Sequence, residues 1–123
     1  KALGEAFHIT SDEWLTWNQI FETLGHHLGR EPVLAHLPSS VVMRADGELG
    51  AGFWGDKSHS MIFDNSKLKS IVPEFEAVVP FAEGSKDIVD WYREDPSRCI
   101  VEPEFDALQD RLARVHADML ALV

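Results

Sequence analysis

The sequence has almost no cysteine and no long apolar segment. Cys99 is the single cysteine among 123 residues, so no internal disulfide can form and a reducing environment is expected. No apolar run approaches the ~20 residues that a membrane-spanning helix needs, and no signal-peptide pattern opens the chain. We therefore expect a cytoplasmic protein without a membrane partner.

Basic residues are also scarce. The chain has 11 lysines and arginines against 21 aspartates and glutamates, and its net charge is −10. Such a charge repels phosphate backbones and anionic lipid headgroups at long range. Nucleic acid is therefore not an expected partner.

Motifs that carry catalysis or bind metal are missing as well. The sequence has no G-x-G-x-x-G turn for a dinucleotide, no H-E-x-x-H and no C-x-x-C. His26 and His27 are adjacent, so on a helix they point about 100° apart and do not converge on one ion. Asp56, Ser58 and His59 lie close together, but triads are assembled from separate elements and no G-x-S-x-G elbow is present. We predict no catalytic residue and no metal ligand in this chain.

What is present is enough apolar sequence for one core. Hydrophobic residues make up 45% of the chain, which suits a single domain of this length. Short apolar runs at 7–10, 33–37 and 61–63 are typical of strands. Together with the helices described next, they predict an α+β domain that is mainly helical, with two or three short strands.

The strongest helical pattern follows Thr10. Thr10 and Glu13 fit a capping box, T-S-D-E. Apolar residues then recur at spacings of three and four up to Leu28, which indicates one buried face. Gly29 suits the left-handed residue that ends a helix.

Residues 53–75 combine a polar loop with a capped helix. We predict a loop at 53–60, rich in aromatic, charged and hydrogen-bonding side chains. Asp64 is the expected N-cap of the next helix, and Pro73 ends it. A loop beside a rigid corner is a common place for a ligand.

Weaker or shorter patterns cover the rest of the chain. Ser39 and Ser40 can cap a short helix through Met43, and 45–52 reads as a glycine-containing connection. A helix is expected from Pro80 onward, with Ile88, Val89, Trp91 and Tyr92 on its buried side. The last helix opens at Glu102-Pro103, and its apolar stripe is Leu108, Leu112, Val115, Met119 and Leu120.

Several of these motifs follow one another in an order that resembles a known family. They are Gly55-Asp56, then Asp64 with Ser66-Lys67, then Pro73, and finally Trp91-Tyr92. This order is similar to the carboxy-terminal part of NAD-dependent epimerase/dehydratases, the extended short-chain dehydrogenases. The resemblance covers roughly residues 4–92.

The resemblance implies that residues 1–123 form a carboxy-terminal substrate-binding portion. In that family the glycine-rich turn that holds NAD or NADP and the Y-x-x-x-K pair belong to an amino-terminal nucleotide-binding domain. Neither feature occurs here, since Tyr92 is followed by Pro96 at the lysine position. The full-length enzyme would bind the cofactor and act on a sugar or nucleotide sugar. This chain alone would not be catalytic, and as a fragment it would expose apolar surface and self-associate.

The family pattern also indicates where a substrate would bind. Family members that act on sugar nucleotides carry an arginine two residues before the G-D pair, where Phe53 stands here. An aromatic surface thus replaces a bidentate phosphate donor. We expect one of Phe53 and Trp54 to pack in the core. For the other, core packing and stacking on a ligand both remain possible. Arg44 either replaces the missing anion contact or is an exposed surface residue. The predicted substrate-binding residues are Arg44, Phe53, Trp54, Asp56, Lys57 and His59.

A second interpretation belongs to a different class of protein. The chain would be a stand-alone acidic binding or interaction module without enzymatic activity. A native reading frame that begins near Lys1 would favour this alternative. An independent metal hydrolase is the least favoured alternative.

Overall fold

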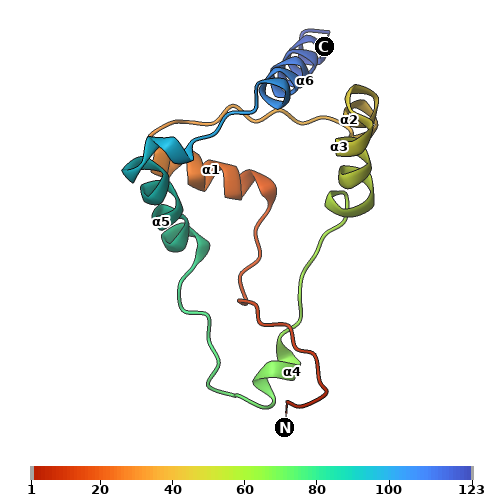
Figure 1. Ribbon diagram of the computed structural model, residues 1–123. Helices are drawn as coiled ribbons and strands as arrows, with labels where there is room; N and C mark the ends of the chain where they lie inside the picture. Colours follow the sequence, from red (N-terminus) through yellow and green to blue (C-terminus); the bar gives the residue numbers. More distant parts are fainter. Residues whose placement is uncertain (1, 123) are drawn as a thin grey trace. The chain divides into compact units, whose positions relative to one another are not determined.

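The chain is helical and divides into two compact units (Figure 1). The computed structural model describes residues 2–122. Of these, 2–32 and 61–95 form unit 1, and 33–60 and 96–122 form unit 2. No residue between 2 and 122 lies in a β-strand. The predicted α+β class is therefore wrong.

The segments predicted as strands are present as extended chain without a ladder. In unit 1 the ring of His8 packs edge-on against Phe63, with 5.1 Å between the ring centroids. The carbonyl oxygen of Thr10 accepts a hydrogen bond from the Asn65 side chain, and that of Ala6 accepts one from Lys67. Side-chain donors thus occupy carbonyls that a neighbouring strand would have used. In unit 2, 33–37 is likewise non-helical and unpaired as a strand.

Helix α1 spans Trp17–Leu28 and begins six residues later than a cap at Thr10 predicts. Thr16 is the N-cap, and its hydroxyl accepts the Gln19 N–H while the Gln19 side chain accepts the Thr16 N–H. The predicted start is wrong because Glu13 is used elsewhere: its carboxylate accepts the backbone N–H of Phe81. The predicted end is confirmed, since Gly29 is left-handed with φ of 68°.

Helix α5 spans Phe81–Glu94 and packs against α1 within unit 1. The Nε2 atom of His27 donates to the carbonyl oxygen of Ala82, 2.8 Å away. Val89 is buried in this contact, as predicted. Ile88, Trp91 and Tyr92 are not: they are 51%, 48% and 43% exposed.

Helix α4 is a single turn, Ser66–Lys69, and is shorter than predicted. Asn65 is its N-cap residue in place of Asp64, whose carboxylate instead accepts the N–H and hydroxyl of Ser66. Hydrogen bonds from the Ser66 backbone and side chain lower the pKa of Asp64. The helix ends four residues before Pro73, so the predicted end at this proline is wrong as well.

A second carboxylate ties α4 to the amino-terminal segment of unit 1. Asp12 accepts hydrogen bonds from Lys69 and from Asn65. These two bonds, the one from Lys69 foremost, lower the pKa of Asp12. The Asn65 amide is buried and also bonds Thr10, so this asparagine fixes the extended segment against α4.

Unit 2 begins with a helical hairpin. Helix α2 spans Ser39–Ala45, α3 spans Gly47–Gly52, and a π-helix, η1, continues over Phe53–Lys57. The prediction of a connection at 45–52 and a loop from Phe53 is wrong. Asp46 overrides the weak helix propensity of the glycines, because its carboxylate caps α3 through the Leu49 N–H at 2.8 Å.

A glycine allows the two helices of this hairpin to touch. A Cβ atom at Gly50 would lie 2.2 Å from the Cα of Met43, so only glycine fits there without a shift of backbone. Val42, on the same turn of α2, is buried. The close approach of α2 and α3 therefore depends on this one position.

The chain ends in unit 2 with a short 3₁₀ turn, η2 (Pro96–Arg98), and helix α6, Pro103–Leu120. Proline at the first helical position is confirmed. Helix α6 contacts α2. Leu108 is buried, whereas Met119 and Leu120 at the far end of the predicted stripe are 42% and 60% exposed.

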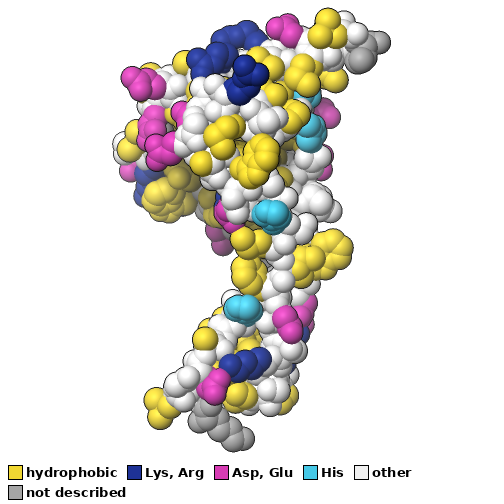
Figure 2. Space-filling view, turned by 90° about the vertical axis from the view of Figure 1, so that its right-hand side faces the viewer, with side chains coloured by type: hydrophobic (Ala, Val, Ile, Leu, Met, Phe, Trp, Pro, Cys, Tyr) yellow, Lys and Arg dark blue, Asp and Glu magenta, His cyan; other side chains and the backbone are white. Residues whose placement is uncertain are grey.

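The core of each unit is small. Among the described residues the buried hydrophobic side chains are Val89 in unit 1 and Val42 and Leu108 in unit 2. Many large apolar side chains remain exposed, and Figure 2 shows hydrophobic side chains at several separate places on the visible face. Each unit thus offers apolar faces that its own residues do not cover.

Candidate functional site

Four of the six predicted substrate-binding residues lie on the π-helix η1. They are Phe53, Trp54, Asp56 and Lys57, and His59 follows two residues after the helix ends. Phe53 is 40% exposed and Trp54 is 57% exposed. Neither ring is in the core, so the prediction that one of them packs there is wrong. π-helical turns are rare and occur frequently at functional sites.

The end of η1 is fixed by a serine. The N–H and the hydroxyl of Ser58 both donate to the carbonyl oxygen of Phe53, each at 2.8 Å. The backbone bond spans five residues, which is the π-helical pattern. The Ser58 hydroxyl also lies 3.0 Å from that of Ser39, at the start of α2. These contacts hold the aromatic pair on a defined turn rather than on a loose loop.

The charged residues of η1 neutralise each other. Lys57 and Asp56 form an ion pair, and the backbone carbonyl of Asp56 accepts the N–H of His59 at 3.2 Å. Both side chains of the pair are about half exposed. Exposed pairs contribute little to stability, so these groups can exchange their partner for hydroxyl groups of a ligand. His59 itself is exposed.

The sixth predicted residue lies apart from the other five. Arg44 is an exposed residue in the last turn of α2. The first turn of α2 contacts the end of η1 through Ser39 and Ser58. Five residues of helix rise about 7 Å, so Arg44 lies near the opposite end of α2. Arg44 is thus separated along α2 from the contact with η1.

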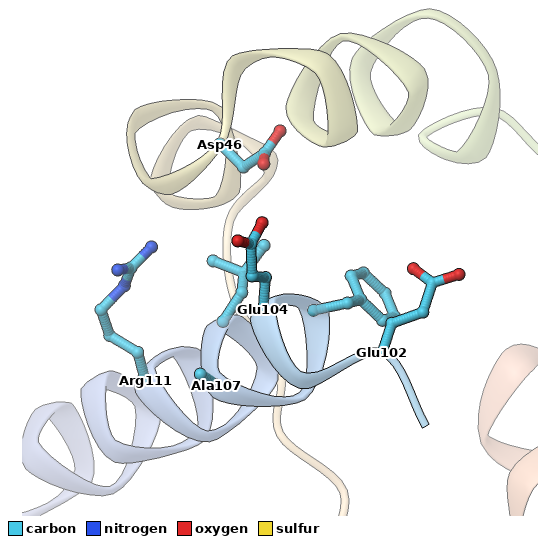
Figure 3. A pocket seen from close by; sticks show the side chains of 7 residues that line it. Asp46, Glu102, Glu104, Ala107 and Arg111 are labelled. Atoms are coloured by element: carbon cyan, nitrogen blue, oxygen red, sulfur yellow. The ribbon is translucent and has the colours of Figure 1, made fainter. Parts of the chain in front are cut away.

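Unit 2 also contains a pocket that none of the predicted residues lines. It lies between the start of α6 and the turn that joins α2 to α3, and its volume is about 350 Å³. In Figure 3 the carboxylate of Glu104 points toward Asp46, and Arg111 comes from the next turns of α6. Arg111 donates to the carbonyl oxygen of Ala45 at 3.3 Å. The lining residues are Asp46, Glu102, Glu104, Phe105, Ala107, Leu108 and Arg111.

The charge of this pocket limits what it can bind. Three carboxylates face one guanidinium group, so a phosphate or diphosphate is disfavoured there. The sequence did not predict this pocket. The only local signal was the D-G-E-L sequence at Asp46, which marks a helix start but not its partner 65 residues later.

The residues present do not fit a dinucleotide cofactor or a metal ion. A dinucleotide-binding turn joins a strand to a helix with glycines in between, and residues 2–122 contain no strand. Across the same residues, no group of three or more metal-ligating side chains comes together.

Comparison with protein-family models, with curated proteins and with solved structures finds no match for this chain. Within residues 2–122, none of the helices combines the length and the apolar character that crossing a membrane requires.

Proposed function

We propose that this chain is the substrate-binding portion of an NAD(P)-dependent epimerase/dehydratase that acts on a sugar or nucleotide sugar. The observation that carries this proposal is the exposed Phe53–Trp54 pair on η1, next to Asp56 and Lys57. The order of the G-D, D-N-S-K and W-Y motifs supports it through their resemblance to that family. The nucleotide-binding domain of the whole enzyme would hold the cofactor and the catalytic residues.

The chemistry of η1 suits a sugar ring. An aromatic face gives a sugar an apolar surface to stack on, and the adjacent carboxylate and ammonium groups can bond its hydroxyls. Trp54 is the more exposed of the two rings, so we assign it the stacking role. Asp56, Lys57 and His59 would orient the hydroxyl groups. Arg44, at the other end of α2, would contact only a distal part of a ligand.

The coding sequence upstream of Lys1 provides the first test. A glycine-rich turn after a first strand, followed by a Y-x-x-x-K, would support the proposal. A start codon within a few residues of Lys1 would overturn it.

The full-length enzyme provides a second test. We expect Trp54→Ala to raise the KM for the sugar substrate on the order of tenfold, the effect of losing ~1.4 kcal/mol of contact. Val33→Ala is the control, because Val33 is 98% exposed and lies off η1. An unchanged KM in Trp54→Ala, with NADH affinity intact, would remove Trp54 from the site.

The second candidate function is a non-enzymatic interaction module. The small cores and the many exposed apolar side chains favour it, since large apolar patches mark surfaces that bind other proteins. In this case Trp54→Ala would alter binding to a protein partner and no sugar would bind. Calorimetric titration of the chain with UDP-glucose separates the two functions, because measurable heat of binding supports the first one only.

A further inference from the structure

Helix α1 presents an apolar face that unit 1 covers only in part. We call this face the α1 stripe, defined by Trp17, Phe21 and Leu28, which are 55%, 51% and 52% exposed. At 100° per residue the three positions lie within about 40° of one another around the helix. Along the axis they span about 16 Å. The rings of Trp17 and Phe21 lie 6.2 Å apart and form a continuous aromatic ridge.

The contact between α1 and α5 uses the adjoining side of the helix. Ile20, Leu24 and His27 are half-buried, and His27 bonds the carbonyl oxygen of Ala82 on α5. At 100° per residue, Ile20 and His27 point about 60° and 80° away from Trp17, and Leu24 points about 20° away, so the half-buried side adjoins the stripe. The α1 stripe is therefore the part of the apolar face that stays about half exposed after unit 1 has packed, and its residues share one side of the helix, as docking anchors do.

The charge of unit 1 determines what kind of surface can cover the stripe. Residues 2–32 and 61–95 contain 13 acidic and five basic side chains, a formal charge of −8. Four of those five basic residues pair with acids of the same unit, namely Lys67, Lys69, Lys86 and Arg93. The same unit of a second copy would bring a charge of −8 against −8 and be repelled, whereas a basic surface would be attracted.

We propose that the α1 stripe is a docking surface for a basic amphipathic helix of a partner protein. The apolar side of that helix covers Trp17, Phe21 and Leu28, and its lysines and arginines meet the acidic surroundings of unit 1. This inference is independent of the enzymatic function proposed for η1, because the stripe and η1 lie in different units.

Three synthetic 14-residue peptides test the proposal with the full chain. The first is an amphipathic leucine/lysine helix, the second has the same composition in scrambled order, and the third keeps the leucines but replaces lysine with glutamate. Binding is followed by the fluorescence anisotropy of the labelled peptides. We expect the amphipathic leucine/lysine peptide to bind at least about tenfold more tightly than either of the others, because it alone has both the stripe and the charge.

Variants of the chain locate the binding site. Trp17→Ala/Phe21→Ala removes the aromatic ridge, and we expect at least about a tenfold loss of affinity for the amphipathic leucine/lysine peptide. Trp91→Ala is the matched control, because Trp91 is a half-exposed tryptophan of α5 in the same unit, and we expect no change. Circular dichroism verifies that each variant keeps its helix content.

Three results would overturn the proposal. Equal binding of the scrambled leucine/lysine peptide would show charge attraction without docking. Equal losses in Trp17→Ala/Phe21→Ala and in Trp91→Ala would show unspecific aromatic contact. A dimer of the unmodified chain that Trp17→Ala/Phe21→Ala abolishes would show that a second copy covers the stripe.

Discussion

At the scale of single residues, the contact between Gly50 and Met43 determines whether α2 and α3 can pack. A methyl group at Gly50 would fall 2.2 Å from the Met43 Cα, so we expect Gly50→Ala to destabilise unit 2 by about 1–3 kcal/mol. Gly52→Ala is the control: its methyl group meets nothing within 4 Å, and the gain in helix propensity is up to ~1 kcal/mol. Urea unfolding followed by circular dichroism measures both. Equal effects of the two substitutions would contradict the close packing of the hairpin.

Also at the residue scale, Asp12 makes the stability of unit 1 sensitive to acid. The hydrogen bond from Lys69 lowers the pKa of Asp12 in the folded chain below its ordinary value of 3.8. This contribution is fully present above pH 3.8 and is lost as the pH falls through the lowered folded pKa. We expect Lys69→Met to raise the pKa of Asp12, as measured by carbon NMR of its carboxyl group. Lys57→Met is the control: it removes an ion pair of unit 2, and we expect the pKa of Asp12 to stay unchanged.

At the scale of elements, two similar sequences could form the capping box of α1. They are Thr10 with Glu13 and Thr16 with Gln19. The structure uses Thr16 and Gln19, so we expect Thr16→Ala to cost about 1 kcal/mol of stability. Thr10→Ala should cost much less, because the bond that Thr10 makes with Asn65 uses its backbone carbonyl. Thermal unfolding of the two variants measures which substitution lowers the stability more. A larger loss in Thr10→Ala would restore the earlier helix start.

The elements that sequence alone could predict are those with long local patterns. Helices α5 and α6 have amphipathic repeats with proline at or near their starts. The start of α1 could not be predicted, because Glu13 is engaged by Phe81, which lies 68 residues away. The strand predictions are wrong for a similar physical reason. A β-ladder needs a second strand to pair with, and no local sequence pattern specifies which segment that is. Helix α3 was missed because its glycines outweighed the cap at Asp46.

The candidate site shows the same division. Sequence could group Phe53, Trp54, Asp56 and Lys57, because they are neighbours in the chain and fall on one turn of η1. It could not predict that both rings are exposed, or that Arg44 lies at the other end of α2. The pocket between Asp46 and Arg111 depends on a packing contact between distant segments, for which the sequence carries no marker.

At the scale of the whole molecule, two features have opposite effects on self-association. The exposed apolar faces favour it, and the large negative charge disfavours it. We expect the isolated chain to self-associate more strongly as salt rises, because salt screens repulsion between molecules of charge −10 and leaves apolar contact intact. Binding of a basic helix to the α1 stripe should weaken over the same range. Analytical ultracentrifugation at 0.05 M and 0.5 M NaCl measures self-association. A chain that stays monomeric at both concentrations would contradict this expectation.

The interleaved composition of the two units has a consequence for synthesis on the ribosome. Unit 1 is built from residues 2–32 and 61–95, so its fold cannot form before the second segment has been synthesised. The hydrogen bond between His27 and Ala82 joins residues that are 55 positions apart. Chain elongation at ~5–20 residues per second leaves the nascent α1 without its packing partner for several seconds. Closing such a separation also slows folding relative to a bundle of sequence neighbours. The side of α1 that packs on α5, with Ile20, Leu24 and His27, thus stays exposed on the growing chain until α5 has been made, and a chaperone could bind it during that interval.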